Sequence, residues 1–263
     1  MRIRHALLLV LLPLSAPRAS EGSARKEAER PFGPGETLTY EIRLLGIETA
    51  RAELEVFDEG ASGVRVRARA RTTGAADGVF RMKSQLSCSL EEQTLDPELC
   101  RGTFQSRSTS RRREIRFDKE TGLIVEGNDE DGEREQKRIQ LEPGFEGVQD
   151  TLSALYLIRA RLPELGETLR FRAVVRSTPV EVEARTARIE ALETGVGTFR
   201  TAVVDVRLFG DVDEETAREA RLWITLDENR LPLKAVTKAP IGSLEARLIG
   251  ARGTRSGTTL AQK

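Results

Sequence analysis

Apolar and polar residues alternate along most of the chain after residue 30. In the stretch GETLTYEIRLL, every second residue from Leu38 to Leu44 is apolar, and polar or charged residues stand between them. This period of two is typical of a β-strand with one buried face. The alternation returns in ETARAELEV, VRVRARAR, FRMKSQLSCSL (with Phe80 and Met82 facing inward), GTFRTAVVDVRLF and GSLEARLIG. The segments between these strands are too short for helical crossovers, so the pattern predicts an antiparallel meander.

One segment departs from this period. In QDTLSALYLIRARLPELG the apolar residues recur at helical spacing, with Asp150 in the position of an N-cap and Pro163 ending the pattern. The sequence therefore predicts a mainly β protein with one main α-helix near 150–162. Its strands would form a strongly curved sheet, a half-barrel or a two-sheet architecture.

The stretch LWITLDENRLPLKA, residues 222–235, contains the only tryptophan, Trp223. Two alternating runs flank DENR, four turn-forming residues, which predicts a β-hairpin with Asp227 capping its turn. A catalytic interpretation would need a partner acid or base, and the stretch offers only Glu228. We therefore expect Trp223 and Asp227 to be structural residues.

Arg159 falls inside the apolar arc of the predicted helix. An unpaired buried charge costs several kcal/mol, so the guanidinium should meet a carboxylate or several carbonyl groups. Asp205 and Asp227 are the first candidates, since each lies in an otherwise apolar strand. The alternative is that Arg159 reaches solvent past Leu155. Either way the residue is structural and not catalytic.

The first twenty residues have the pattern of a secretory signal peptide. Arg2 and Arg4 precede an apolar run from Ala6 to Leu12, and small residues follow, so cleavage is expected between residues 16 and 20. No cysteine lies nearby to carry a bacterial lipoprotein anchor, and no later stretch is apolar enough for a transmembrane anchor. We expect a periplasmic or secreted protein, with a flexible leader at 21–30, one β-rich domain at 31–250 and a frayed tail at 251–263.

Two cysteines, Cys88 and Cys100, remain in the exported chain. A pair of cysteines in an exported protein predicts a disulfide. Cys88 shares the inward parity of its neighbours Leu86 and Leu90, and Cys100 begins the next strand. Their spacing fits neither a metal site nor a redox CxxC motif.

Composition restricts the chemistry further. The 42 basic and 42 acidic residues balance, so no overall charge draws the protein to nucleic acid. The only histidine, His5, lies in the signal peptide, which removes the commonest general base and metal ligand from the exported chain. Ser153 lacks the Gly-x-Ser-x-Gly motif, and no pair of acids stands out for glycoside chemistry. The sequence thus predicts no catalytic residues, no metal ligands and no cofactor.

Basic side chains also form a stripe. The arginines at 65, 67, 69 and 71 face outward from one strand, and those at 111–113 are expected in a loop. They fit an anionic partner such as phospholipid headgroups, lipopolysaccharide or polysaccharide. The simpler interpretation, which we favour, is a solvated face whose charges are balanced across strands by Glu41, Glu53 and Glu55.

The order and spacing of GETLTYEIRLLGIETARAELEV, TLDPEL, DTLSALYLIRARL, GETLRFRAVV, LWITLDENRLPLKA and GSLEARLIG resemble the domain-of-unknown-function 3108 family of exported bacterial proteins. The resemblance covers roughly Pro31 to Gly250. It implies an exported, mostly antiparallel β protein and supplies no catalytic residues. The tryptophan hairpin also resembles the corner of the lipoprotein-carrier half-barrels, which hold acyl chains.

The sequence leaves three functions open. The first is a non-enzymatic periplasmic binding or carrier module for an apolar or envelope-derived ligand, with a lipid or another envelope component as its partner. The second is an envelope interaction or structural protein without a small ligand, and the third is an enzyme of unknown type. An apolar cavity would favour the first over the second, and paired buried carboxylates in a cleft would favour the third.

Overall fold

A computed structural model of the protein describes residues 30–60, 63–118, 120–141, 147–211, 218–239, 242–257 and 259–261. The expected signal peptide and residues 21–29 of the expected leader lie outside this part of the chain. The described residues form sixteen strands of one sheet and two helices. Among them, neither helix is long and apolar enough to cross a membrane.

The N-terminal half of the sheet consists of β1 (Thr37–Leu44), β2 (Ile47–Asp58), β3 (Val64–Thr72), β4 (Met82–Leu90), β5 (Pro97–Ser106), β6 (Ser110–Asp118), β7 (Leu123–Glu130) and β8 (Glu133–Gln140). The C-terminal half consists of β9 (Val148–Gln149), β10 (Thr168–Val175), β11 (Thr178–Thr194), β12 (Gly197–Phe209), β13 (Glu219–Thr225), β14 (Pro232–Ala239), β15 (Gly242–Arg252) and β16 (Leu260–Ala261). The helices are α1 (Gly74–Val79), between β3 and β4, and α2 (Thr151–Ala160), between β9 and β10.

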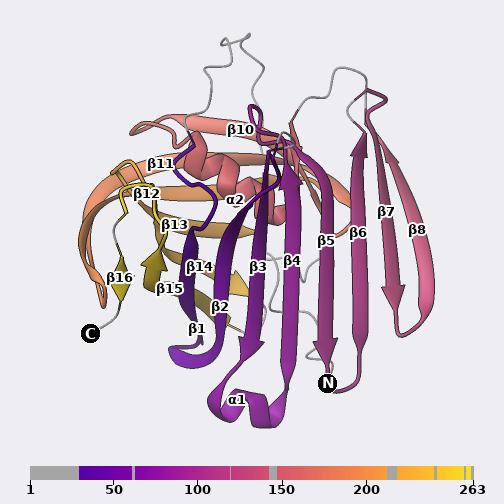
Figure 1. The fold of residues 1–263 in the computed structure, drawn as a ribbon, viewed down its shortest axis with the longest axis horizontal. Coiled ribbons are helices and arrows are strands. Elements are labelled where there is room, and N and C mark those ends of the chain that lie inside the picture. Colours follow the sequence, from indigo (N-terminus) through magenta and orange to yellow (C-terminus); the bar gives the residue numbers. More distant parts are fainter. Residues whose placement is uncertain are drawn as a thin grey trace.

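The two halves are antiparallel meanders that meet at one pair of strands, except that β9 pairs parallel with β10 after a crossover through α2. β1 pairs antiparallel with β15, from Thr37 opposite Arg252 to Leu44 opposite Leu244. From this pair, strands β2 to β8 follow one another in one direction and strands β14 to β9 in the other, while β16 pairs with β15 alone. The strands at the two ends of this order, β8 and β9, do not pair with each other, so the sheet curves without closing (Figure 1). The predicted mainly β protein with a strongly curved antiparallel sheet is confirmed.

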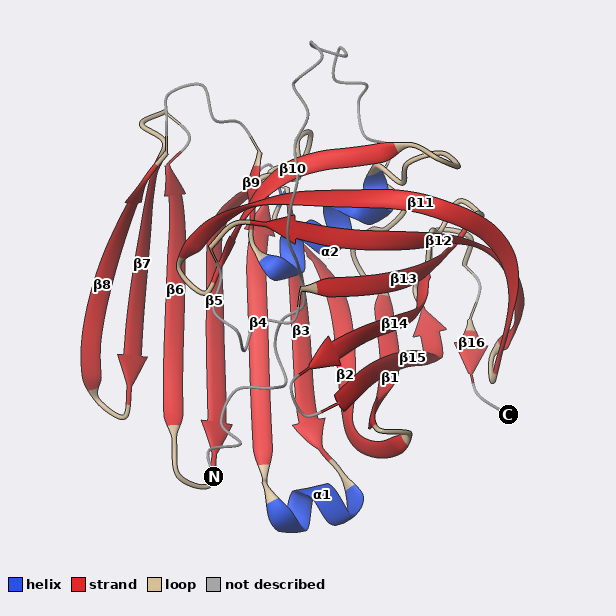
Figure 2. Cartoon of the chain, turned by 180° about the vertical axis from the view of Figure 1, so that it is seen from behind, coloured by secondary structure: helices blue, strands red, loops and turns tan. Residues whose placement is uncertain are grey.

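The core lies on the concave side, around α2, which sits between the two halves of the sheet (Figure 2). Leu152, Tyr156 and Ala160 of this helix pack with inward residues of β2 to β7. Ile158 packs with buried residues of β10 to β13. A third cluster of apolar residues lies where β1 meets β14 and β15. One short helix thus contacts the apolar faces of both halves.

Cys88 and Cys100 lie opposite each other in the register of β4 and β5, and a disulfide joins them. The cysteine that the alternation places inward, Cys88, is 1% exposed. The bond lies in the core beside α2 and not on the surface.

Three expectations are wrong. Phe80 does not face inward, because α1 occupies Gly74–Val79 and β4 begins only at Met82, which leaves Phe80 37% exposed. Arg111, Arg112 and Arg113 lie in β6 and not in a loop. The segment 251–263 is not simply frayed, because β15 extends to Arg252, β16 pairs with it, and Ser256 exchanges hydrogen bonds with Asn229.

Candidate functional site

α2 begins at a buried capping box. The side chain of Asp150 accepts hydrogen bonds from the backbone N–H groups of Leu152 (2.8 Å) and Ser153 (2.9 Å). In return, the hydroxyl of Ser153 accepts from the backbone N–H of Asp150 at 2.8 Å. Burial raises the pKa of Asp150 above its ordinary value. The Cys88 sulfur lies 3.0 Å from the carboxylate, but a disulfide sulfur has no proton to donate, so this contact does not stabilise the charge.

The helix ends at a fully buried arginine. Arg159 donates two parallel hydrogen bonds to the carboxylate of Glu36, at 2.8 and 3.0 Å, and neither side chain is more than 1% exposed. Its remaining donors reach the backbone carbonyls of Asn229 (3.1 Å) and Arg230 (3.0 Å). Such a paired fork is the strongest arrangement available to a guanidinium.

The expected partners of Arg159 are therefore wrong, although the expected pairing with a carboxylate is what the structure has. Asp205 pairs with Arg221 at the surface, at 2.6 Å. Asp227 accepts hydrogen bonds from the hydroxyl of Thr225 and the N–H groups of Asn229 and Arg230. It holds the turn of the β13–β14 hairpin, which is the structural role expected for it.

Aromatic rings enclose the ion pair. The guanidinium carbon of Arg159 lies 5.1 Å from the ring centre of Phe32 and 5.3 Å from that of Tyr156. Burial disfavours the charge of Arg159, but the adjacent carboxylate of Glu36 holds the pKa of Arg159 above its ordinary value. The group is therefore charged and neutralised in place, and it offers no proton and no free charge to a substrate.

Arg230, in the β13–β14 turn, also binds the end of α2. Its side chain donates to the backbone carbonyls of Ala160 (2.6 Å) and Arg159 (3.2 Å). These carbonyls belong to the last turn of α2, where the helix leaves acceptors unsatisfied. The hairpin turn and the helix end are thus connected by two arginines, each bonded to the backbone of the other segment.

The neighbouring tryptophan has partners of its own. The indole N–H of Trp223 donates to Glu190 at 2.6 Å, and the ammonium of Lys234 lies 4.8 Å from the ring centre. Trp223 is 8% exposed. Its side chain is buried against neighbouring strands of the sheet. Among the described residues it lines neither of the two pockets that the structure shows.

Side chains also join the two unpaired ends of the sheet. Glu126 on β7 is 1% exposed and accepts hydrogen bonds from Arg113 (2.8 Å) and from Ser177 (2.9 Å), which lies in the β10–β11 turn. Burial favours the neutral acid, but Arg113 holds the pKa of Glu126 below its ordinary value. Nearby, Gln149 donates to Asp96 at 3.3 Å, while its buried amide oxygen has no partner among the described residues.

Sequence reasoning missed these polar contacts. Glu126 shows a signal that could have been used, because it follows Ile124 at the inward parity of its strand, where an acid needs a partner. Glu36 shows the same signal, because it stands two residues before Leu38 at the inward parity of that strand. Arg230 shows none, since it lies in a turn where no period applies.

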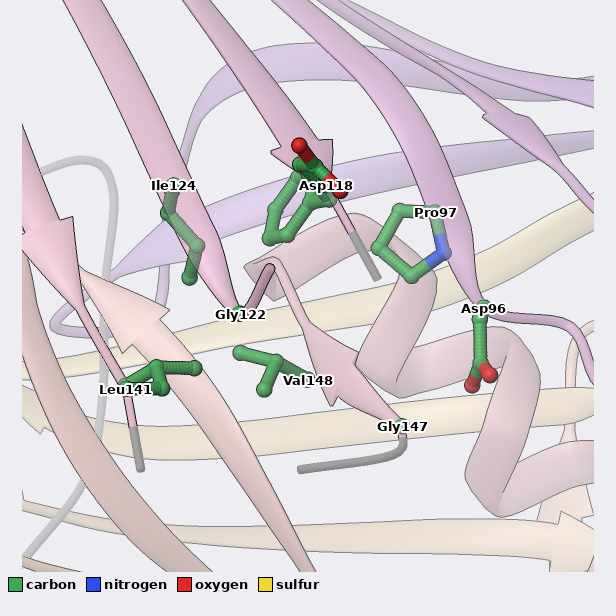
Figure 3. Close-up of a pocket in the computed structure, with 9 residues that line it drawn as sticks. Asp96, Pro97, Asp118, Gly122, Ile124, Leu141, Gly147 and Val148 are labelled. Carbon is green, nitrogen blue, oxygen red and sulfur yellow. The ribbon is translucent and has the colours of Figure 1, made fainter. Parts of the chain in front are cut away.

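The open space beside the helix is small. A pocket of about 20 Å³ lies where Ile124, Leu141 and Val148 gather (Figure 3). Its other lining residues are Asp96, Pro97, Phe117, Asp118, Gly122 and Gly147. This volume suits about one water molecule and no apolar ligand. In the observed arrangement α2 itself fills the hollow of the sheet.

The site lacks the groups of a catalytic centre. In the described part of the chain, Cys88, Cys100 and Asp150 form the one cluster with metal-ligand spacing, but both sulfurs are held in the disulfide and cannot act as thiolates. The hydroxyl of Ser153 is engaged in the capping box. The arrangement can neutralise charge and position a helix, and it presents no nucleophile with a base.

Known proteins are similar to this chain at the level of sequence family and of fold. The model of a family described as "Protein of unknown function (DUF3108)" matches residues 39–249. A solved β-barrel-like protein of the DUF1849 family from Brucella abortus is similar to 84% of this chain and 97% of its own, with 13% identity and a TM-score of 0.57. This likeness shows the fold alone.

Two further solved structures have TM-scores too low to support an argument. They are a candidate lipoprotein from Parabacteroides distasonis (10% identity, 83% and 95% of the two chains, TM-score 0.33) and a candidate exported protein from Bacteroides fragilis (12% identity, 82% and 96%, TM-score 0.34). The sequence has no match among the curated proteins. Neither the matched family nor the DUF1849 structure indicates a class of enzyme.

The first prediction concerns Arg159. Arg159→Leu leaves Glu36 buried without its partner, so we expect a loss of roughly 3 kcal/mol or more in the free energy of unfolding, measured by urea denaturation. In the Arg159→Leu background, Glu36→Gln should recover part of this loss by replacing the orphaned charge with a neutral amide. An unchanged or raised urea midpoint for Arg159→Leu would show that the pair is not needed.

The second prediction concerns Asp150 and pH. Its folded pKa is raised, so its contribution to stability is greatest below the ordinary pKa and is lost as pH rises through the folded pKa. Asp150→Asn keeps the capping oxygen without the charge. The variant should gain stability relative to the parent as pH rises from the acid range towards neutrality. Asp150→Ala lacks both the charge and the cap, so it should be less stable than Asp150→Asn by about 1 kcal/mol at every pH. A constant difference between Asp150→Asn and the parent would contradict this assignment.

The third prediction compares two buried tyrosines, in both of which burial raises the pKa of the phenol and keeps it neutral. The hydroxyl of Tyr40 donates to the carbonyl of Pro232 at 2.8 Å. The hydroxyl of Tyr156 is buried and has no hydrogen-bond partner among the described residues, although the guanidinium of Arg159 lies close to its ring. Tyr40→Phe should cost about 1 kcal/mol, and Tyr156→Phe should cost nothing or stabilise slightly. Equal losses in thermal unfolding would contradict this difference.

Proposed function

The chain belongs to the DUF3108 family of proteins of unknown function. We propose that it is a non-enzymatic binding or carrier module of the bacterial cell envelope. Its ligand would be apolar, such as the acyl chains of a lipid. The site of this ligand would be the hollow of the curved sheet, in the place that α2 occupies.

One observation carries this proposal: the concave faces of both halves are apolar, and a single ten-residue helix fills the space between them. An isolated helix of this length is marginal in water. The position of α2 therefore depends on its contacts with the sheet and the turns. A ligand with long apolar chains could replace those contacts if the helix moved aside.

The contacts that hold the end of α2 are polar and come from outside the sheet faces. Glu36 precedes β1, and the carbonyls of Asn229 and Arg230 belong to a hairpin turn. The unpaired ends of the sheet are joined by side chains such as Ser177 and Glu126, with no strand pairing between β8 and β9. Separating these ends breaks few hydrogen bonds, which favours this side as the route to the hollow.

A second candidate function also has support. The pocket beside α2 holds only about 20 Å³, as expected of an envelope interaction or structural protein in which α2 is a permanent part of the core. The two functions differ in whether α2 competes with an apolar ligand.

The fourth prediction separates them. Arg230→Ala removes two hydrogen bonds to the last turn of α2 and should populate the state in which the helix has moved. The apparent affinity of a ligand scales with the population of the competent state, so stearic acid carrying an anthroyl label should bind about three- to tenfold more tightly than it binds the parent. Fluorescence titration gives both constants.

Arg221→Ala is the matched control, because it removes an arginine from the surface pair with Asp205, on β12 and β13. It should leave the affinity unchanged. Binding that is equal in Arg230→Ala and the parent would mean that the ligand does not compete with α2. Absence of binding in all three proteins would refute the carrier function and leave the second candidate.

A further inference from the structure

One end of the sheet exposes apolar side chains from two neighbouring connections. Leu45 (67% exposed) and Ile47 (70%) form the tip of the β1–β2 hairpin, and Val79 (76%) and Phe80 (37%) belong to α1 and the residue after it. Among the described residues, only Leu165 and Leu226 are further large apolar side chains with comparable exposure. The exposed apolar residues are thus concentrated at this end, which we call the α1 end (Figures 1 and 2).

Hydrogen bonds connect the segments that make up the α1 end. The backbone N–H of Thr73, just before α1, donates to the carbonyl of Thr49 on β2 at 3.0 Å. From the β5–β6 turn, Arg107 donates to the carbonyl of Gly78 in α1 at 2.7 Å. The β1–β2 hairpin, α1 and the β5–β6 turn are therefore held together as one surface.

The backbone at the tip of the β1–β2 hairpin has an unusual conformation for its sequence. Leu45 and Gly46 both have positive φ, 52° and 85°, and form a two-residue turn between β1 and β2. Such turns favour Asn-Gly or Asp-Gly, because residues with a bulky side chain disfavour this backbone region. Leucine at the first position is unfavourable for the backbone and is also exposed to water. Two costs at one residue point to a role outside the stability of the fold.

The charges of the α1 end differ from those of the rest of the sheet. Further along β3, Arg65, Arg67 and Arg69 each pair with a glutamate. At the α1 end, Arg71 lies between Arg51 and Lys83 in the register of β2, β3 and β4. Within the described residues we find no ion-pair partner for Arg71 or Lys83.

These two cations line an open pocket of about 420 Å³ beside α1. Its remaining residues are Thr72, Thr73, Gly74, Asp77, Arg81 and Met82. The one acid, Asp77, is bound by Arg81 at 3.1 Å, and its pKa is lowered, first by a hydrogen bond from Thr72. The pocket therefore presents uncompensated positive charge next to exposed apolar side chains.

We propose that the α1 end docks on the surface of a bilayer that contains anionic phospholipid. Leu45, Ile47, Val79 and Phe80 enter the boundary between headgroups and acyl chains, and Arg71 and Lys83 contact the phosphates. Apolar side chains at the tips of separate connections, flanked by cations, match the layered chemistry of this interface, in which apolar chains lie beneath anionic groups. This inference concerns a different face from the hollow and does not depend on the proposed function.

The experiment uses protein that begins at residue 21, which lacks the apolar segment from Ala6 to Leu12 and keeps every described residue. It is sedimented with vesicles of phosphatidylcholine, with and without phosphatidylglycerol. We expect binding to the anionic vesicles, weakened by added salt because the attraction is screened. Arg71→Glu/Lys83→Glu and Val79→Ser/Phe80→Ser should each weaken it at least about tenfold.

Two controls carry single changes of the same two kinds, a charge reversal and an apolar-to-serine replacement, elsewhere on the surface. Arg138→Glu changes an exposed arginine on the edge strand β8, and Leu165→Ser changes a leucine that is 59% exposed before β10. Both should bind like the parent. As a second measurement, Phe80→Trp should show a blue shift of its emission on anionic vesicles, and Leu165→Trp should not. The parent, whose only tryptophan is the buried Trp223, supplies the background.

Three results would overturn the proposal. The first is that the parent does not bind anionic vesicles. The second is that the α1-end variants bind as well as the controls do. The third is that the parent self-associates without lipid in light scattering and Val79→Ser/Phe80→Ser abolishes it, which would make the α1 end an interface between two copies of the chain.

Discussion

The buried pair of Arg159 and Glu36 is the contact on which the placement of the other parts depends. It joins three segments that are distant in sequence: the entry to β1, the end of α2 and the β13–β14 turn. Apolar packing is not directional, so the two apolar faces alone would accept α2 in several positions. The directional hydrogen bonds from Arg159 to the Glu36 carboxylate and to two carbonyls allow α2 only one position. Because desolvation offsets much of its attraction, we interpret this pair as a device for specificity more than for stability.

Local patterns carried much of the fold. Alternation identified most of the strands, and the departure from it identified α2 and its cap at Asp150, because both features depend only on neighbouring residues. The helical wheel also placed Arg159 in the apolar arc, where its charge must either meet an acceptor or reach solvent. Its partner could not be chosen this way, because Glu36 lies 123 residues away and its inward parity does not show which buried cation it meets. α1 was missed for a related reason: GAADGV is short, has two glycines and shows no amphipathic pattern.

The equal numbers of basic and acidic residues acquire a structural meaning in the folded chain. Many arginines on the outer face stand opposite or diagonal to a glutamate of the next strand, as Arg67 does with Glu55 and Arg170 with Glu183. Each exposed pair contributes little to stability. Together, however, they leave the outer face nearly neutral, so that a site with unmatched charge differs from its surroundings. Arg71 and Lys83 are therefore informative in a way that the composition alone concealed.

The junction of β1 and β15 has a consequence for how the chain folds. Most other strand pairs join neighbours in sequence and can form as hairpins, whereas Thr37 meets Arg252 only after the intervening chain has been ordered. Contacts of such long range form slowly, because the entropy of closing the loop is lost before the contact is gained. During synthesis β1 would present an unpaired edge until β15 arrives, and an open edge invites pairing with other chains. The rate of this last closure then determines how long each newly made molecule needs protection from aggregation.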